Sequence, residues 1–255
     1  MCGRFVAASS PALIADRFAV DEVDASVGEE STPDYNVSPR RAVLAVREHD
    51  DERVLSRLRW GLVPSWAKDL AIGDKMINAR AETVAQKPAY RKAFANKRCI
   101  VPADGFYEWK PGVAPPGGAK PVKQPYFIHR RDGEPLAFAG LWEVWKVPEG
   151  LDPELGGPDG WLRSCAIVTG PANDVLAPIH NRMPVVLPAS AWEQWLDPDN
   201  HDVDALSRLL VPAPSELFEA YEIATLVNNA RNNGSELVRR LEQLGNSAGE
   251  RGGAA

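Results

Sequence analysis

Cys2 is the residue with the most distinctive chemistry in the sequence, which begins Met-Cys-Gly-Arg-Phe. Methionine aminopeptidases remove Met1 when the second residue is small, and Cys2 would then carry a free α-amine beside its thiol. An α-amine has a pKa of ~8 against ~10.4 for lysine, so far more of it is unprotonated at neutral pH and able to attack an aldehyde. The thiol can then close onto the imine carbon as a thiazolidine ring, because intramolecular closure has a high effective molarity. On this stretch alone, a small residue at a loose chain end is the simpler explanation.

Two further stretches carry side chains that suit such chemistry. The segment MINARAET at 76–83 places Asn78 and Arg80 two residues apart, so both lie on one face if the chain is extended. The segment PADGFYEWK at 102–110 puts Glu108 between two aromatic residues, and a carboxylate beside aromatic surface can act as a desolvated acid or base. The ordinary alternatives are a capped helix start and an exposed charge at a strand end.

One histidine stands in a comparable setting. His180 and Arg182 lie in APIHNRMPVVL at 177–187, between two prolines and before an apolar run. A histidine in a rigid polar segment can transfer protons near neutral pH. A loop histidine without function is the ordinary alternative, and it is the explanation we adopt for the other histidines of the chain.

The elements that must position these residues are mostly strands. Apolar and β-branched runs predict strands on both sides of a polar turn at 48–52, over 98–110, around the turn Asp132-Gly133, and over 164–173. Helical spacing predicts short helices over 11–20 with a cap at Ser9 or Ser10, over 81–98 with a break near Pro88, over 189–197 and over 202–210.

No sequence pattern repeats at a fixed period, and strands do not alternate regularly with long helices. We therefore predict one α+β domain built on a mostly antiparallel, curved or barrel-like sheet that short helices flank. This domain is expected over residues 2–240, with a disordered tail at 241–255.

The composition is that of an ordinary globular protein. The chain has 255 residues, 44% hydrophobic and 25% charged, and its net charge of −6 argues weakly against a duplex-binding protein. Its 3 cysteines show no CxxC or Cys/His spacing, which predicts a reducing compartment, no disulfide framework and no zinc site. Because neither a signal peptide nor a spanning helix is apparent, we expect a soluble cytoplasmic protein without metal or other cofactor.

Several short motifs, taken in order, closely resemble the SRAP family, the SOS response-associated peptidase-like or abasic-site processing proteins. These motifs are Met1-Cys2-Gly3-Arg4-Phe5, YNVSP at 35–39, WGLVPSW at 60–66, NAR at 78–80, DGFYEW at 104–109 and HNRMP at 180–184. The segment VNNARNNGSELV at 227–238 also resembles the family, so the resemblance covers nearly the whole chain. Each motif alone is weakly specific, but together, behind an N-terminal cysteine, they are a strong signature.

The resemblance implies a function in the DNA damage response. Members of the family bind single-stranded DNA that contains an abasic site, and their N-terminal cysteine forms a thiazolidine with the aldehyde of the opened sugar. This crosslink shields the lesion from strand cleavage and error-prone bypass. Carried over by motif, the resemblance makes Cys2 the nucleophile and gives Asn78 the role of positioning its backbone and amine. Glu108 becomes the acid/base that deprotonates the amine and supports crosslink reversal, and His180 handles the protons of ring opening and imine formation.

Residues of the same motifs are expected to contact DNA: Arg4, Asn36, Pro39, Trp66, Arg80, Trp109 and Arg182. The guanidinium groups suit bidentate phosphate contacts, and the indole rings suit stacking on bases or wedging of the strand. The two YNVSP residues are expected to line the same groove. Since acidic residues collect in the loops 21–34 and 147–160 and beyond residue 193, we predict a charge-segregated surface with one positive groove.

Other functions stay open at this point. An N-terminal-nucleophile cysteine peptidase, which the family's older name suggests, would form an acyl-thioester instead of a thiazolidine. A non-catalytic single-strand binding module would bind intact and abasic DNA alike and tolerate Cys2→Ala. A weak lyase activity would follow where a Schiff base proceeds to β-elimination. In the favoured interpretation the partner is abasic single-stranded DNA, with no membrane and no metal, and the protein is a monomer.

Overall fold

The larger of two sheets closes into a barrel. The computed structural model describes residues 2–28, 32–112 and 121–241. The larger sheet has the strand order β12-β11-β10-β7-β4-β5-β2, and β5 also pairs with β11, so five strands close on themselves. The barrel strands are β4 (Ala42–His49), β5 (Glu52–Trp60), β7 (Arg98–Ala103), β10 (Leu136–Lys146) and β11 (Trp161–Pro171). An odd number of strands cannot close with every pair antiparallel, and here β5 and β11 are the parallel pair. Short strands attached to the barrel are β2 (Glu22–Val23), β6 (Asn78–Arg80) and β12 (Arg182–Pro184).

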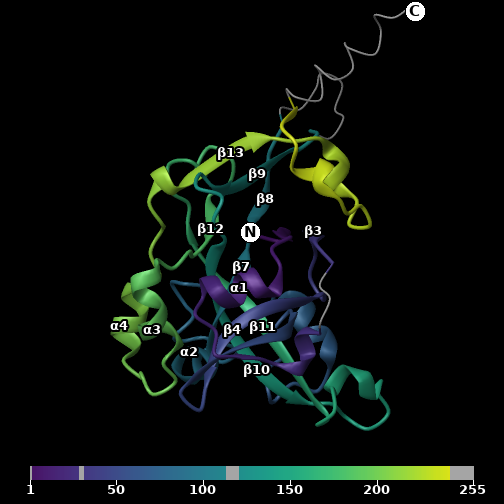
Figure 1. The fold of residues 1–255 in the computed structure, drawn as a ribbon, viewed down its shortest axis with the longest axis vertical. Helices are drawn as coiled ribbons and strands as arrows, with labels where there is room; N and C mark the ends of the chain where they lie inside the picture. Colours follow the sequence, from purple (N-terminus) through teal and green to yellow (C-terminus); the bar gives the residue numbers. More distant parts are fainter. Residues whose placement is uncertain (1, 29–31, 113–120, 242–255) are drawn as a thin grey trace, which may run out of the picture.

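The smaller sheet lies above the barrel in Figure 1 and has the order β13-β9-β8-β1-β3. Its strands are β1 (Phe5–Ala7), β3 (Asp34–Val37), β8 (Gly105–Lys110), β9 (Gln124–Arg130) and β13 (Phe218–Glu222). The N-terminal segment, purple in Figure 1, lies in the middle of the molecule, between this sheet and the barrel. The first residues of the chain are therefore enclosed by structure, in contrast to the loose end that a second-position cysteine alone suggests.

The chain crosses between the two sheets at Asp104. The sequence predicts one strand over 98–110, and this prediction was wrong, because β7 ends at Ala103 and β8 begins at Gly105 in the other sheet. A side chain at Gly105 would collide with the ring of Phe127, so only glycine allows this close approach. The Asp104 carboxylate accepts a hydrogen bond of 2.9 Å from the backbone N–H of Ser9, which ties the crossing to the end of β1.

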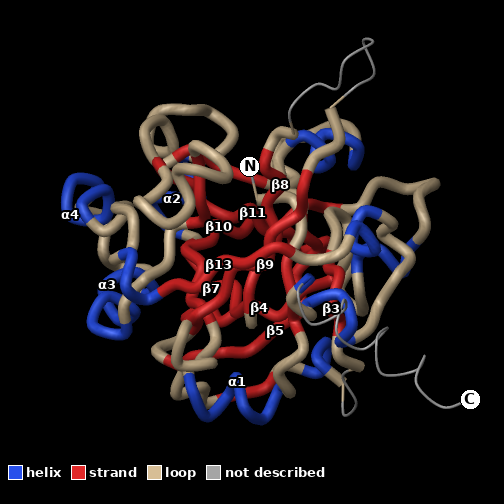
Figure 2. Tube along the Cα trace, turned by 90° about the horizontal axis from the view of Figure 1, so that it is seen from above, coloured by secondary structure: helices blue, strands red, loops and turns tan. Residues whose placement is uncertain are grey.

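Helices cover the outside of the barrel, as Figure 2 shows from above. They are α1 (Pro11–Arg17), α2 (Arg91–Asn96), α3 (Trp192–Leu196) and α4 (Val203–Arg208). The predicted cap of α1 is confirmed, since the Ser10 hydroxyl accepts a 3.2 Å hydrogen bond from the backbone N–H of Leu13. The helix predicted over 81–98 is shorter than expected, because turns occupy most of residues 81–90. Short 3-10 helices complete the described fold: η1 (Ala25–Val27), η2 (Leu70–Lys75), η3 (Pro153–Gly156), η4 (Ala189–Ala191), η5 (Ser215–Leu217), η6 (Thr225–Asn228) and η7 (Ser235–Val238).

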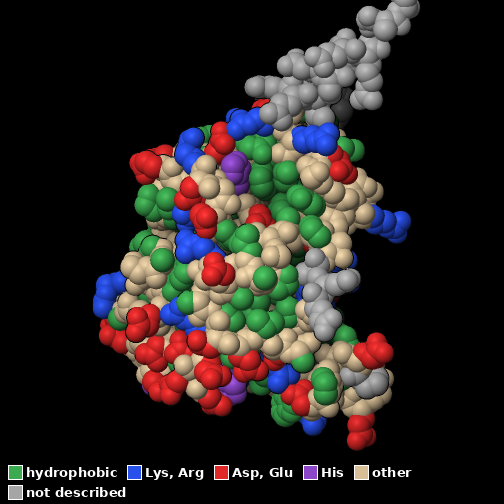
Figure 3. All heavy atoms as spheres, viewed as in Figure 1, with side chains coloured by type: hydrophobic (Ala, Val, Ile, Leu, Met, Phe, Trp, Pro, Cys, Tyr) green, Lys and Arg blue, Asp and Glu red, His purple; other side chains and the backbone are tan. Residues whose placement is uncertain are grey.

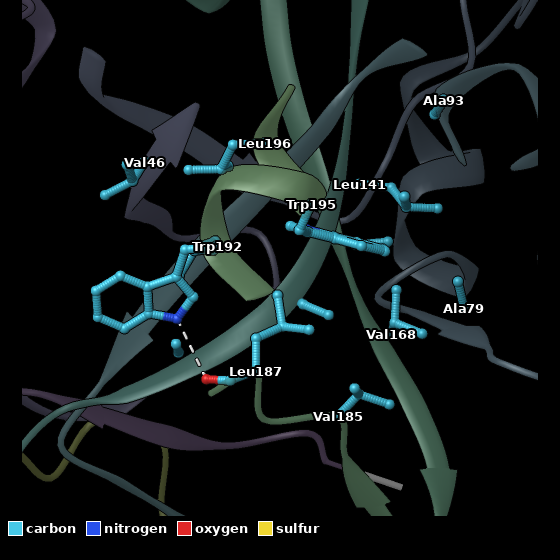
Figure 4. Close-up of a cluster of buried hydrophobic side chains, with 14 of the residues drawn as sticks. Val46, Ala79, Ala93, Leu141, Val168, Val185, Leu187, Trp192, Trp195 and Leu196 are labelled. Atoms are coloured by element: carbon cyan, nitrogen blue, oxygen red, sulfur yellow. Dashed lines mark hydrogen bonds between the residues drawn. The ribbon is translucent and has the colours of Figure 1, made fainter. Parts of the chain in front are cut away.

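Two aromatic residues anchor α3 on the outer face of the barrel. Figure 4 shows Trp192 and Trp195 among aliphatic side chains of the barrel strands, and the Trp192 indole N–H donates a 3.2 Å hydrogen bond to the Leu187 carbonyl. Arg98, buried at the start of β7, donates to the carbonyls of Phe94 and Trp195 and so ties α2 and α3 to the sheet. Burial lowers the pKa of Arg98 to about 10, so its guanidinium is still charged at neutral pH.

The predicted fold class is confirmed: the protein is α+β with a barrel-like, mostly antiparallel sheet. The opposite face of the barrel strands packs with Phe5 and Phe106 of the smaller sheet, so one apolar cluster joins both sheets. Apart from Leu241, the predicted tail at 241–255 lies outside the described residues, as do 29–31 and 113–120 of the predicted loops. Within the described ranges, every helix is too short or too polar to cross a lipid bilayer.

Candidate active site

Cys2 is fully buried where the two sheets meet, and its backbone is fixed by Asn78. The side-chain amide nitrogen of Asn78 donates a 2.7 Å hydrogen bond to the Cys2 carbonyl. The thiol sulfur lies 4.0 Å from the Arg4 carbonyl. Met1 precedes Cys2 in the sequence, so the Cys2 nitrogen becomes an amine only when Met1 is removed.

Asn78 is held by the strand pairing of β6. This strand runs parallel to β11, with Asn78 opposite Ile167, and the Tyr90 hydroxyl donates a 3.1 Å hydrogen bond to the Asn78 carbonyl. The segment is extended, as the prediction of a shared face for Asn78 and Arg80 requires, and the buried Ala79 between them faces the other way. The Asn78 side-chain oxygen is buried and accepts no hydrogen bond within the described ranges. It is therefore available to a donor at Cys2.

Glu108 comes to Cys2 through the pairing of β1 with β8. Phe5 lies opposite Phe106, and the backbone N–H of Tyr107 donates a 3.0 Å hydrogen bond to the Arg4 carbonyl. Continuing this register places Gly3 opposite Glu108 and Cys2 beside it. Glu108 is only 3% exposed, and its burial raises the pKa of the carboxyl, although the nearby His180 acts in the opposite direction.

The Cys2 thiol is protonated at neutral pH in this environment. Its burial raises the thiol pKa far above the ordinary value, and the negative charge of Glu108 raises it further. This effect of Glu108 agrees with the proximity of the two residues in the β1–β8 register. A buried, protonated thiol is a poor first nucleophile, and it needs a nearby base before it can attack.

His180 lies in the turn between β11 and β12, and a backbone contact sets its tautomer. The Arg182 backbone N–H donates a 3.0 Å hydrogen bond to Nδ1 of His180. A neutral ring therefore carries its proton on Nε2, where it can donate. The Arg182 side chain forms a two-pronged ion pair with Glu82, at 2.7 and 3.1 Å, and this pair fixes the start of β12.

Glu108 and His180 line one pocket of about 470 Å³. Its other walls are Trp109, Val122, Lys123 and Asn228. A cavity of about 540 Å³ elsewhere, between β5 and β11, contains none of the predicted catalytic residues, so we place the chemistry in the smaller one. Among the described residues, no group of three or more His, Cys, Asp or Glu side chains is arranged to hold a metal ion.

The residues predicted to contact DNA fall into three groups in the structure, of which two differ in exposure and the third is bound within the protein. Trp66 is 56% exposed and Arg80 is also exposed, so both side chains are accessible to a strand. Pro39, Trp109 and Arg182 are half-buried, Trp109 in the wall of the pocket and Arg182 in its ion pair.

Arg4 and Asn36 are occupied inside the protein. The Arg4 guanidinium donates to the Asn36 side-chain oxygen at 2.6 Å and to the Val227 carbonyl at 3.0 Å. Asn36 is 4% exposed, and its amide nitrogen donates to the carbonyls of Asn229 and Asn232. Their contacts with DNA remain predictions, whereas their contacts with the 227–232 segment are part of the fold.

Acidic side chains are most concentrated in one part of the face seen in Figure 3. Asp and Glu side chains gather at the lower left of that view, where Figure 1 places α2, α3 and α4. Lys and Arg side chains are scattered over the same face, and those in its upper part lie beside both acidic and hydrophobic side chains. A charge-segregated surface with a single positive groove remains a prediction.

Sequence reasoning gave no role to two of the pocket residues, Lys123 and Asn228. Lys123 follows a Pro/Gly-rich loop and carries no motif. Asn228 lies in the VNNARNNGSELV segment, which resembles the corresponding part of the SRAP family but implies no role for any single residue. A run of asparagines in a segment without regular strand or helix patterning was the one available signal.

Comparison with known proteins gives consistent results. The family model described as SOS response associated peptidase (SRAP) matches residues 1–230. The abasic site processing protein YoqW of Bacillus subtilis is 42% identical over 238 residues, which are 93% of this chain and 99% of that protein. The abasic site processing protein YedK of Escherichia coli is 32% identical over 247 residues, which are 94% of this chain and 99% of that protein. A crystal structure of a Bacteroides thetaiotaomicron protein superposes with a TM-score of 0.77 at 25% identity, over 94% of this chain and 99% of that one.

Proposed function

The chain belongs to the SOS response associated peptidase (SRAP) family, and from this premise we propose that it processes abasic sites by bonding covalently to them in single-stranded DNA. The names of its relatives support abasic-site processing in the DNA damage response. The observation that carries the finer proposal is the setting of Cys2, whose carbonyl is held by Asn78 at 2.7 Å beside the buried Glu108. A residue held so firmly next to the start of the chain is poised to use its own α-amine once Met1 is removed.

The proposed reaction begins with the amine. The Cys2 α-amine loses a proton, to Glu108, and adds to the aldehyde of the opened abasic sugar to give a carbinolamine. His180 donates a hydrogen bond from its Nε2–H to the departing oxygen, and Glu108 returns its proton to that oxygen, so that water leaves. The nitrogen passes its remaining proton back to Glu108, and an imine remains. The thiol then adds across the imine, so that a carbon–sulfur bond forms and the thiol proton passes to the nitrogen. One water is lost in all, and the product is a thiazolidine.

The raised thiol pKa favours this order of events over a peptidase mechanism. A cysteine peptidase attacks with its thiolate, which burial and Glu108 together disfavour at Cys2. In the amine-first order, the thiol attacks only after the imine is formed, when closure is intramolecular and a less activated sulfur suffices. Cys2 is thus better suited to trap an aldehyde than to cleave a peptide bond.

The experiment compares wild-type protein with Cys2→Ser on a single-stranded oligonucleotide that carries one abasic site. Cys2→Ser keeps the amine but closes the five-membered ring less readily, so the heat-stable adduct is expected to disappear. An imine that cannot close can proceed to β-elimination, so strand cleavage is expected to rise in the same variant. A heat-stable adduct of Cys2→Ser at the wild-type level would rule out the thiazolidine.

A further inference from the structure

The pocket that holds Glu108 and His180 also contains hydrogen-bond donors that the proposed chemistry does not use. They are the ammonium group of Lys123 and the side-chain amide of Asn228. We propose that these two groups bind the phosphate next to the abasic sugar and thereby place its aldehyde against Cys2. This inference rests on the proposed function and adds a phosphate subsite to it.

The indole of Trp109 sets the orientation of Asn228. The Trp109 indole N–H donates a 2.7 Å hydrogen bond to the Asn228 side-chain oxygen. An indole N–H can only donate, so the oxygen must be the atom of the amide that faces it. The amide nitrogen, which can only donate, is left without an acceptor in the part of the chain that the structure describes. Asn228 therefore offers its donors to a ligand in the pocket.

The backbone on either side of Asn228 is tied to the strands that lead to Cys2. Arg4, next to β1, donates to the Val227 carbonyl, and Asn36 of β3 donates to the Asn229 carbonyl, each at 3.0 Å. Val227 itself is fully buried. Because the same elements hold both ends of the site, the distance from the Asn228 amide to Cys2 is fixed by the fold. Arg4 and Asn36 are therefore positioning residues for this subsite.

Lys123 is fixed at the rim of the pocket by its neighbours. It directly precedes β9, whose first residue Gln124 pairs with Lys110 of β8. The backbone of Gly112 packs against the Val122 carbonyl so closely that a side chain at Gly112 would collide with it. Within the described ranges, the Lys123 ammonium is engaged in no ion pair, whereas many arginines of the chain have carboxylate partners. The backbone of Lys123 is thus fixed, and its exposed ammonium has no carboxylate partner among the described residues.

The chemistry of an abasic site favours a phosphate as the ligand of these donors. At the lesion itself, where the base is missing, the strand offers only sugar oxygens and the flanking phosphates for recognition. Phosphate oxygens accept hydrogen bonds and carry negative charge, which complements an ammonium group and an amide N–H pair. The buried carboxylate of Glu108 in the same pocket disfavours a free anion there, so the phosphate belongs at the rim with Lys123, and the sugar lies deeper.

The test measures the rate of adduct formation on three strands: one with ordinary phosphates, and two with a neutral methylphosphonate on either side of the abasic sugar. Lys123→Ala is expected to slow the reaction on the ordinary strand about tenfold, as the loss of a charge-assisted hydrogen bond predicts. On one of the two neutral strands, wild-type protein is expected to be slow and Lys123→Ala to add no further loss. Lys92→Ala, an exposed lysine on α2, is the control and should match wild type on all strands.

Asn228→Asp separates recognition from packing. It keeps an acceptor for the Trp109 indole but replaces the amide donor with a carboxylate that repels phosphate. The variant is expected to be slower than wild type on the ordinary strand, and to match the slower wild-type rate on the same neutral strand that abolishes the Lys123 effect. Equal slowing by Lys123→Ala or Asn228→Asp on all three strands would overturn the phosphate subsite. Absence of any adduct with wild-type protein would instead overturn the proposed function itself.

Discussion

Asn78→Ala tests whether the geometry around Cys2 matters for its reactivity. The substitution removes the 2.7 Å hydrogen bond to the Cys2 carbonyl and leaves a buried carbonyl without its donor. Leaving a buried acceptor unsatisfied costs about 1–3 kcal/mol of unfolding free energy. For a chain of this size each kcal/mol corresponds to about 2–4 °C in Tm, so a measurable but tolerable loss of stability is expected.

The substitution is also expected to slow adduct formation, and this slowing is the result that tests the positioning role of Asn78. Without Asn78 the Cys2 amine samples several orientations, and adduct formation is expected to slow by about tenfold to a hundredfold, which corresponds to ~1.4–2.7 kcal/mol in the barrier. The assay is single-turnover adduct formation on an abasic oligonucleotide, resolved on a denaturing gel. Binding to the intact strand, measured by fluorescence anisotropy, is expected to change little.

Two companion variants complete the test. Asn96→Ala removes a similar amide-to-carbonyl hydrogen bond, of 3.0 Å to Lys92, on the exposed end of α2, and it is expected to leave the adduct rate unchanged. Asn78→Asp replaces the donor with an oxygen that repels the Cys2 carbonyl, and it is expected to be at least as slow as Asn78→Ala. If Asn78→Ala, folded and stable, forms the adduct within about twofold of the wild-type rate, the positioning role assigned to Asn78 is wrong.

Three other predictions concern acid/base chemistry and DNA binding. Burial raises the pKa of Glu108, so the folded state holds this proton more tightly than the unfolded state; the stability it contributes is complete below the unfolded pKa of ~4.3 and is lost as pH rises through the folded pKa. Glu108→Gln is therefore expected to melt at a higher temperature than wild type at pH 8 but not at pH 4, and to form the adduct more slowly; equal melting temperatures at both pH values would contradict the burial effect. Arg80→Ala is expected to weaken binding to intact and abasic strands alike and to reduce the slope of log affinity against log salt by about 0.7, whereas an effect on chemistry alone would exclude a phosphate contact. Trp66→Ala is expected to leave the melting temperature unchanged, because the ring is 56% exposed, and to weaken single-strand binding by about 1–3 kcal/mol in titrations; unchanged affinity would show that the ring does not stack on bases.

Local signals in the sequence were sufficient for several elements of the fold. The Ser10 cap and the polar turn before Glu52 each depend on residues close together in the chain, and both were predicted correctly. The division of 98–110 between two sheets was missed because its cause is distant: Gly105 must pass close to Phe127. An isolated glycine after a strand pattern does not reveal which ring it will meet.

At the site, too, the sequence indicated which residues take part but not which distant residues they contact. The motifs indicated Cys2, Asn78 and Glu108, and the structure brings these residues together through β6 and through the β1–β8 ladder. The sequence could not show that Arg4 is committed to Asn36 and the Val227 carbonyl, because this bond joins residues 223 positions apart. An arginine in a motif predicts an anion partner, and only the fold shows that carbonyl oxygens take that place.

The central claim is that the processed N-terminus bonds covalently to the abasic site. The most direct measurement is the intact mass of purified protein after reaction with an abasic single-stranded oligonucleotide and denaturation, followed by mapping of the modified peptide. The account predicts a species equal to the protein without Met1 plus the oligonucleotide minus one water, with the modification at Cys2. Protein that demonstrably lacks Met1 and still forms no such species would contradict the account.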